Sequence, residues 1–415
     1  AGSRLYSVRA DMRFFEVINN SLNELLFLST PFVDLRFIQE HLIITTKDSV
    51  LIYDSNFNPI TQVYSSDITN TEFTCSTIDN ETIYIGTINR GILKTTINNT
   101  TTFEELHPEG PLLNNSFSIE AGNNSLWLTF GDYSLTYNPA PTRLRGISHL
   151  LDGEWINISK DSVLDARNLN TISINPFNND QVFISSFMDG LLEVNEEQIT
   201  LYNQTNSALE PLNVTNPNYI SIRVSASNFD TQGILWTMSA RVENPLKSYN
   251  PNSGQWQSFN FSSLIPDALN GEWGYSDIEI DANGTKWIGG YNYGLIGFNN
   301  SNGQLLKNLA SEEDNMPTTF VTTLALDKRN QIWIGTTNGL RVLYNTSNFF
   351  EEENVQVNQI IILEDGIPKE LLFQQLISDI EVDGSNNKWI ATISSGLFYF
   401  SSDGQETIFH FTKDN

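Results

Sequence analysis

One short pattern recurs through the chain and restricts its fold more than any other feature. In its clearest form, an Asp opens a polar turn, Trp-Ile-Gly-Thr begins six residues after that Asp, and a short loop leads to Gly-Leu and an aromatic residue. The three clearest copies occupy residues 281–298, 327–344 and 383–400. Because spacing, residue type and flanking turn recur together, the pattern indicates an internal structural repeat.

Weaker copies extend the repeat toward the N-terminus. They begin at Ile43 (IITT), Tyr84 (YIGT), Trp127 (WLTF), Phe183 (FISS) and Trp236 (WTMS). The roughly eight copies recur at a period of about 40–56 residues, which is the range of propeller blades. Each copy has the pattern of four short strands, and no segment shows a sustained helical period. The sequence therefore predicts an all-β fold, a β-propeller of seven or eight four-stranded blades.

The two ends of the chain fit the repeat less well. Residues 22–30 have the pattern of a unit that lacks room for its later strands, and the chain stops at residue 415, where another unit would begin. We therefore expect residues 1–30 to be a partial blade or the remnant of a preceding propeller, and residues 31–415 to form the propeller region. Partial blades of an adjoining propeller at the ends belong to the same expectation.

Charge and composition limit the partners and cofactors. The 415 residues include 49 acidic and 22 basic side chains, a formal net charge of −27. Such a field repels polyanions, so we expect no nucleic acid partner. No apolar run reaches the roughly 18 residues that span a bilayer, so no transmembrane segment is expected. One cysteine, Cys75, excludes an intrachain disulfide and a cysteine-based metal centre, and we expect neither metal nor cofactor.

The repeated tryptophans and aspartates have structural explanations. Every blade faces the same packing problem, so a Trp at one blade position is expected to pack between blades rather than to bind a ligand. The Asp-rich turns lack the distal Glu of a calcium loop and are expected to be Asx turns. No nucleophile elbow, zinc-protease motif or phosphate loop is present. The sequence thus predicts a protein that is not an enzyme, although a distant carboxylate pair for polysaccharide lyase chemistry stays open.

Candidate binding residues lie in the loops between the second and third strands. These loops emerge on one face of a propeller and differ most from blade to blade. Tyrosines on either side of an Asn can stack on a sugar or a peptide, and a basic doublet can hold a phosphate or carboxylate. The alternative is that these are ordinary exposed loop residues. The predicted ligand or partner residues are Arg90, Tyr133, Arg143, Arg145, Arg241, Tyr291 and Tyr293.

The repeat resembles the two-component-regulator propeller repeats of Bacteroidetes sensor proteins. Several segments also resemble the PorZ-like surface proteins of the type IX secretion system; they are residues 82–87, 136–139, 253–258, 330–343, 383–389 and 404–407. PorZ-like proteins carry two propellers and a β-sandwich, and this chain is too short for all three domains.

The resemblance implies an exported protein at the cell surface, associated with the outer membrane. It implies a non-catalytic module of an attachment complex with a PorU-like sortase, other complex components and anionic lipopolysaccharide, and it transfers no catalytic residue. The alternative function is a glycan-sensing periplasmic propeller of a hybrid two-component regulator.

Overall fold

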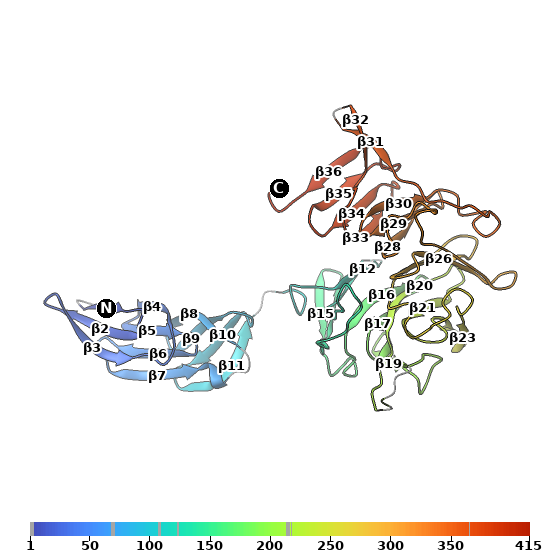
Figure 1. The fold of residues 1–415 in the computed structure, drawn as a ribbon. Coiled ribbons are helices and arrows are strands. Elements are labelled where there is room, and N and C mark those ends of the chain that lie inside the picture. Colours follow the sequence, from blue (N-terminus) through green and yellow to red (C-terminus); the bar gives the residue numbers. More distant parts are fainter. Residues whose placement is uncertain are drawn as a thin grey trace. The chain divides into compact units, whose positions relative to one another are not determined.

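The computed structural model describes residues 4–67, 71–106, 109–122, 124–212, 216, 218–364 and 366–415. In these residues the regular structure is β-strand, apart from one 3-10 turn at Ser65–Asp67. The chain divides into two compact units, Ala1–Gly110 and Pro111–Asn415 (Figure 1). The expected boundary at residue 30 falls inside the first unit, and residues 1–3 of the expected partial blade lie outside the described residues.

The first unit contains three antiparallel sheets. Their strands are β1 (Leu5–Val8), β2 (Arg13–Ile18) and β3 (Ser21–Phe27); β4 (Phe32–Ile38), β5 (His41–Thr46), β6 (Ser49–Asp54) and β7 (Pro59–Tyr64); and β8 (Phe73–Asp79), β9 (Thr82–Thr87), β10 (Ile92–Thr96) and β11 (Asn99–Leu106). The residues of the expected partial blade thus form a three-stranded sheet, β1-β2-β3. It packs on the second sheet through Phe14, Leu42 and Ile44, and the second packs on the third through Ile43 and Ile85.

The second unit contains six blade-like sheets and one hairpin. The first three sheets are β12 (Ser118–Gly122), β13 (Ser125–Thr129), β14 (Ile147–Leu151) and β15 (Glu154–Ile158); β16 (Leu169–Asn175), β17 (Asn178–Ser186), β18 (Gly190–Asn195) and β19 (Gln198–Tyr202); and β20 (Val224–Phe229), β21 (Leu235–Ser239), β22 (Leu246–Asn250) and β23 (Gln255–Phe259). The others are β24 (Tyr275–Ile280), β25 (Lys286–Gly290), β26 (Leu295–Asn299) and β27 (Leu305–Leu309); β28 (Val321–Leu326), β29 (Ile332–Thr336) and β30 (Gly339–Leu343); and β33 (Ile377–Val382), β34 (Lys388–Thr392), β35 (Gly396–Phe400) and β36 (Thr407–Phe411), with the hairpin β31 (Ile361–Glu364) and β32 (Ile367–Glu370) between the last two.

The predicted all-β propeller architecture of repeated antiparallel blades is confirmed, and the grouping of the blades differs from expectation. The first strands β12, β16, β20, β24, β28 and β33 lie side by side in chain order, and residues of all six line one central cavity. The copies of the repeat at Ile43 and Tyr84 belong to the first unit. A run of similar copies gives no indication of which of them share a ring, so the sequence suggested seven or eight blades in one ring.

In three copies of the repeat, the Asp makes the same set of hydrogen bonds. One oxygen of Asp281 accepts hydrogen bonds from backbone amides two and four residues further on, both at 2.9 Å. The other oxygen accepts one from the indole of Trp287 at 3.2 Å. The same three bonds recur at Asp230 and Asp327. The predicted Asx turns are thus present, and the six-residue spacing places the indole over the turn that its own Asp closes.

The repeated Trp side chains pack between sheets, as predicted. Trp127 and Trp236 are 4% exposed and Trp287 and Trp333 are nearly inaccessible, whereas Trp389 in the last sheet is half-buried. Where a Lys precedes the Trp, the Lys crosses to the Trp of the preceding sheet. The ammonium of Lys286 lies 3.7 Å from the ring centroid of Trp236, and that of Lys388 lies 4.4 Å from that of Trp333. Such cation–π contacts link neighbouring sheets.

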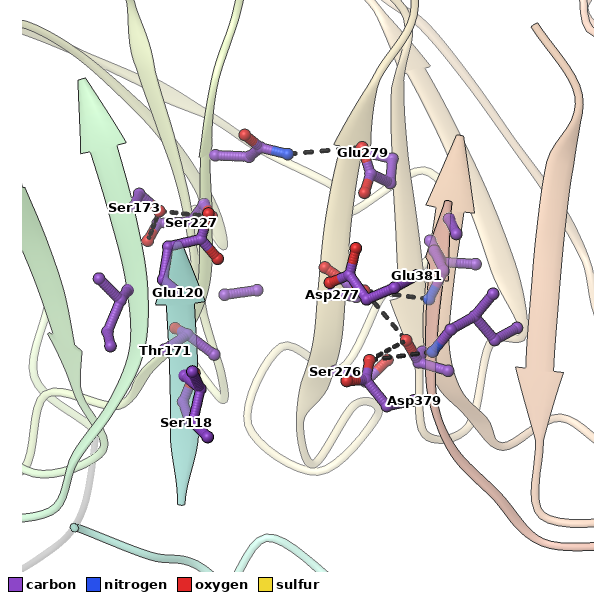
Figure 2. A pocket seen from close by; sticks show the side chains of 18 of the residues that line it. Ser118, Glu120, Thr171, Ser173, Ser227, Ser276, Asp277, Glu279, Asp379 and Glu381 are labelled. Atoms are coloured by element: carbon purple, nitrogen blue, oxygen red, sulfur yellow. Dashed lines mark hydrogen bonds between the residues drawn. The ribbon is translucent and has the colours of Figure 1, made fainter. Parts of the chain in front are cut away.

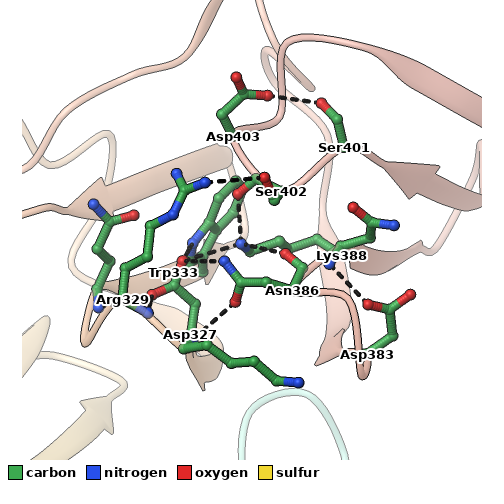
Figure 3. Close-up of polar contacts among 12 residues, drawn as sticks. Asp327, Arg329, Trp333, Asp383, Asn386, Lys388, Ser401, Ser402 and Asp403 are labelled. Carbon is green, nitrogen blue, oxygen red and sulfur yellow. Dashed lines mark hydrogen bonds and ion pairs between the residues drawn. The ribbon is translucent and has the colours of Figure 1, made fainter.

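Around Lys388 the link is a complete polar clasp (Figure 3). Its ammonium donates to Asp327 Oδ2 at 3.0 Å and to the carbonyls of Asn386 and Ser402 at 2.8 and 2.6 Å. Both side chains of the ion pair are 0% exposed. Burial opposes ionisation of Asp327, but hydrogen bonds from the Gln331 amide and from Lys388 hold its pKa below the ordinary value. We call this set of contacts the Lys388 clasp.

A bulge recurs in the first strands of the second unit. The register shifts at Ala226 in β20, Asp277 in β24, Thr323 in β28 and Asp379 in β33. The extra residue in these bulges is Ser225, Ser276, Thr322 or Ser378. A bulge turns the following side chain away from the regular alternation of the strand. Here it brings residues of the first strands to the wall of the central cavity.

Candidate functional site

The central cavity of the second unit is a channel of about 740 Å³. Its wall comes from the first strand of each of the six blade-like sheets. Five carboxylates and no basic side chain occur among the described residues that line it; they are Glu120, Asp277, Glu279, Asp379 and Glu381. Figure 2 shows Glu120 on one side of the channel and Asp277, Asp379 and Glu381 on the other. The wall on the side of Glu120 also carries hydroxyl groups from β16 and β20, which face Asp277, Asp379 and Glu381 across the channel.

Hydrogen bonds hold the carboxylates in place. Asp277 accepts from the Leu324 amide of the next sheet at 3.0 Å and from its own following amide at 2.8 Å. The hydroxyl of Thr323 lies 3.4 Å from an oxygen of Asp277 and 3.4 Å from an oxygen of Asp379. Glu279 is held more weakly, by the Asn228 amide at 3.5 Å. The bulges therefore place carboxylates from the two sheets on either side of β28–β30 around one shared hydroxyl of that sheet.

Burial and mutual repulsion raise the pKa values of these carboxylates. Burial raises the pKa of Glu120 to about 7, and the charges of Glu381 and Asp277 add to this shift. The same two causes raise the pKa of Glu381 to about 7 and that of Asp277 to about 6. The pKa of Glu279 is also raised well above its ordinary value by burial. The channel is therefore a region of negative potential in which part of the charge is neutralised by protons.

An aromatic cluster adjoins the channel, and one of its members, Tyr133, also lines the channel wall. It consists of Tyr133, Tyr137, Phe187, Tyr291 and Phe320. The rings of Tyr291 and Phe320 are 4.4 Å apart between centroids, and those of Tyr133 and Tyr137 are 5.2 Å apart and stacked. Four of these residues come from loops between second and third strands, and Phe320 directly precedes β28. We call this side of the second unit the loop face, and the side that carries the Asp turns the turn face.

A buried carboxylate organises the loop that carries Tyr291. Glu272 is 1% exposed and accepts backbone hydrogen bonds from Tyr291, Asn292 and Tyr293 at 3.0 to 3.1 Å. It also accepts one from Trp273 at 2.9 Å. Burial raises the pKa of Glu272 to about 7, although these donors oppose the shift. Glu272 therefore determines the conformation of the loop and, with it, the position of Tyr291 in the aromatic cluster.

The structure brings two of the predicted binding residues together. Tyr133 and Tyr291 both belong to the aromatic cluster, and Trp273, 46% exposed, stacks on Tyr291 with a centroid distance of 5.7 Å. Tyr293 lies two residues further on and packs against the core between the third and fourth sheets of the unit. The predicted pair Tyr291 and Tyr293 thus faces two different environments.

The predicted arginines are separated. Arg143 and Arg145 lie on the long loop between β13 and β14, where Arg143 is 3.5 Å from Asp132 and Arg145 donates to the Phe130 carbonyl at 2.6 Å. Arg241 donates to the Leu269 carbonyl at 2.8 Å and lines a different cavity, of about 420 Å³. Arg90 lies in the first unit and pairs with Glu105. The doublet Arg143 and Arg145 therefore does not form a single clamp.

The acidic channel and Glu272 are features that the sequence reasoning missed. The five carboxylates lie on three different first strands, and four of them belong to two copies of one short motif, Ser-Asp-Ile-Glu at 276–279 and 378–381. One pattern could have indicated part of the channel: Tyr-Ser-Asp at 275–277 and Ile-Ser-Asp at 377–379 occupy equivalent positions before the repeat Asp. Nothing comparable distinguishes Glu272, whose partners are backbone amides.

The described residues contain neither a cluster suited to a metal ion nor a helix that could cross a membrane. Within those residues, no three His, Cys, Asp or Glu side chains lie in an arrangement that could hold a metal ion. The part of the chain that the structure describes also contains no helix of the length and apolarity needed to cross a membrane.

The fold and the channel together define a propeller-type chain whose blades are arranged around an acid-lined centre. Over 99% of its length, the chain superposes on PorZ, described as an essential bacterial surface component of the type IX secretion system of Porphyromonas gingivalis, with a TM-score of 0.76 and 21% sequence identity. The chain spans 57% of that protein. The similarity establishes a shared fold, as the segments quoted from the sequence led us to expect.

A second solved structure is less similar to this chain. The extracellular domain of a putative hybrid two-component system from B. thetaiotaomicron matches with 12% identity over 97% of this chain and 61% of that domain, at a TM-score of 0.34. No protein-family model matches the chain, and no curated protein does.

Proposed function

We propose that this chain is the propeller region of a non-catalytic cell-surface protein that works in a type IX secretion attachment complex. The observation that supports the proposal is the superposition on PorZ over 99% of the chain at a TM-score of 0.76. In this role the chain binds a sortase-like, PorU-like partner and other components of the complex at the outer membrane, and anionic lipopolysaccharide is a second ligand. A propeller suits such a task because its loops vary while its blades keep the scaffold rigid.

The surface that we assign to the protein partner is on the loop face. An apolar notch of about 240 Å³ lies there beside the aromatic cluster, between the first and last sheets of the second unit. Its rim includes Phe117, Leu135 and Ile393, which are 37%, 53% and 69% exposed. Aromatic and aliphatic side chains around a pocket are typical of the central part of a protein interface. The acidic channel, by contrast, disfavours lipopolysaccharide phosphates, so the anionic ligand is expected outside it.

The test is purification of the tagged full-length protein from its native cell envelope. We expect recovery of a sortase-like protein, and loss of that protein in the double variant Leu135→Asp, Ile393→Asp. The matched control is Phe177→Asp, because Phe177 is 71% exposed and lies in a first turn, on the turn face. Recovery of a histidine kinase with bound oligosaccharide would instead identify the sensor function and would refute the proposed role.

A further inference from the structure

A second cavity lies on the turn face of the second unit. It is a groove of about 420 Å³ between the sheet β20–β23 and the sheet β24–β27. One wall carries Ser248, Gln255 and Gln257 from β22 and β23, and Lys286 lies on the other. Among the described residues, no hydrogen-bond partner is found for the side chains of Ser248, Gln255 or Gln257. The groove therefore presents several unused donors and acceptors next to an ammonium group.

The ammonium of Lys286 is buried without an ion-pair partner. Lys286 is 4% exposed, and its Nζ donates to Asn300 Oδ1 at 3.0 Å and lies 3.7 Å from the Trp236 ring centroid. Among the described residues, no carboxylate forms an ion pair with it. A buried ammonium is costly unless acceptors surround it, and this one has one neutral acceptor and one ring.

Two carboxylates also line the groove, and both already have partners. Asp230 and Asp281 each accept two backbone hydrogen bonds from their own turns and one from an indole. Burial lowers the pKa of Lys286 to about 8, and the charges of Asp230 and Asp281 oppose this shift only in part. The chain itself thus leaves the positive charge of Lys286 under-compensated.

The Lys388 clasp shows what is missing around Lys286. Both lysines are the fifth residue after the repeat Asp, and Lys388 has a carboxylate and two carbonyls as acceptors. In the clasp, Asn386 fills the space between the sheets and donates to Asp327 Oδ2 at 3.3 Å. The equivalent of Asn386 is Gly284, where an added Cβ would meet only the Ser301 hydroxyl, at 3.7 Å. The groove is open because this position carries no side chain.

We propose that the groove binds a small hydroxylated carboxylate, with the chemistry of a sugar acid. The carboxylate accepts hydrogen bonds from Lys286, whose ammonium forms an ion pair with no carboxylate of the described residues, and the hydroxyl groups bond to Ser248, Gln255 and Gln257. A volume of about 420 Å³ is ample for one such unit. The groove lies on the turn face, away from the partner surface assigned above. The inference therefore goes beyond the proposed function and does not rest on it.

The experiment is calorimetric titration of the purified chain with D-glucuronate, and with D-glucose as a ligand of similar size that lacks the carboxylate. We expect glucuronate to bind and glucose to bind at least about tenfold more weakly, a difference of about 1.4 kcal/mol. Lys286→Gln removes the ammonium and should weaken glucuronate binding by about tenfold or more. Lys160→Gln, at an exposed lysine of the same unit, should leave it unchanged.

A second variant tests the groove without removing the charge. Gly284 has a φ of +75°, close to the +67° of Asn386, so Gly284→Asn fits the backbone and should fill the groove as Asn386 fills the clasp. We expect Gly284→Asn to abolish glucuronate binding while the protein stays folded, which also covers the case that Lys286→Gln unfolds. An oligosaccharide that ends in a uronate, titrated in parallel, distinguishes a glycan end from a free sugar acid as the source.

Three results would overturn the inference. They are binding of glucose equal to that of glucuronate, retention of glucuronate binding in Gly284→Asn, or no binding of either glucuronate or the uronate-ended oligosaccharide. None of them bears on the partner recovered from the cell envelope. Failure of this inference is therefore distinguishable from failure of the proposed function.

Discussion

Buried charges in this chain are held by very different sets of partners. Lys388 has a carboxylate and two carbonyls, Glu272 has backbone amides of one loop, and Lys286 has one amide oxygen and a ring. These partners determine how far the free energy of unfolding falls when each side chain is removed, because a buried group that loses its partner keeps its desolvation penalty. Two predictions follow at the scale of single residues.

The first concerns Glu272. Its change to Ala leaves the amides of Asn292 and Tyr293 without their acceptor, whereas the Tyr291 amide keeps the Gly274 carbonyl, and we expect a loss of about 3 kcal/mol in the free energy of unfolding. The loop should also release Tyr291, so the fluorescence of Trp273, which stacks on Tyr291, should change. Urea denaturation and emission spectra measure the two effects, with Glu353→Ala as the exposed control. Unchanged stability and fluorescence would show that Glu272 does not hold the loop.

The second prediction compares Lys388 with Lys286, which occupy the same position in two copies of the repeat. Lys388→Met leaves Asp327 buried and unpaired, and we expect a loss of roughly 3–5 kcal/mol. The double change Asp327→Asn, Lys388→Met should recover part of this loss. Lys286→Met leaves no ion-paired carboxylate behind and should cost clearly less. Equal losses for the two single variants, measured by urea denaturation, would contradict the difference between clasp and groove.

At the scale of the elements, β24, β28 and β33 each have one side chain that packs on the preceding sheet. Ile278, Leu324 and Ile380 occupy this position and are 0%, 2% and 3% exposed. Ile119 occupies it in the first sheet of the second unit and is 56% exposed. Equivalent residues in the repeat therefore differ in burial according to the place of their sheet in the chain.

This difference can be measured with one matched pair of substitutions. Ile278→Ala creates a cavity between two sheets and should lower the free energy of unfolding by about 2–4 kcal/mol. Ile119→Ala removes an exposed side chain and should lower it by less than about 1 kcal/mol. Denaturant titration of this chain compares them. A similar loss for both would mean that Ile119 is covered in solution.

The elements also show how far the sequence could predict the structure. The blades, the Asx turns and the packing of Trp287 and Trp333 were predictable, because the same local contacts recur in several copies of the repeat. That Tyr133 and Tyr291 share a face followed from the order of the strands. The contact of Tyr133 with Phe187, and the separate directions of Arg143 and Arg145, depend on irregular loops that do not repeat. The division into two units was not visible, since copies in both units look alike.

At the scale of the whole molecule, the charge of −27 and the acidic channel make stability depend on pH. The pKa of Glu120 and of Glu381 is about 7 in the folded chain, against an ordinary value of 4.5. Between these values the folded state binds more protons than the unfolded state, so stability falls as pH rises through this window. Carboxylates with lowered pKa, such as Asp327, lose their contribution only below the ordinary Asp value of 3.8.

We therefore expect the chain to be more stable at pH 5 than at pH 8, with a thermal midpoint higher by about 5 °C. The double change Glu120→Gln, Glu381→Gln should raise the midpoint at pH 8 and reduce its dependence on pH. Calorimetry of both proteins at the two pH values tests this. A midpoint that rises from pH 5 to pH 8, or an equal pH dependence in both proteins, would contradict the expectation.

The recurring bulge has a consequence for how such a protein can change. Each bulge separates the apolar side chains of a first strand, which pack on the preceding sheet, from the polar ones that reach the channel, such as Asp277, Thr323 and Asp379. Glu120 and Glu381 reach the channel without a side-chain hydrogen bond to a neighbouring sheet among the described residues, so substitutions there leave the contacts between sheets intact. A few substitutions, in natural divergence or by engineering, can therefore make the channel of such a scaffold acidic, neutral or basic. The blades and their order stay the same.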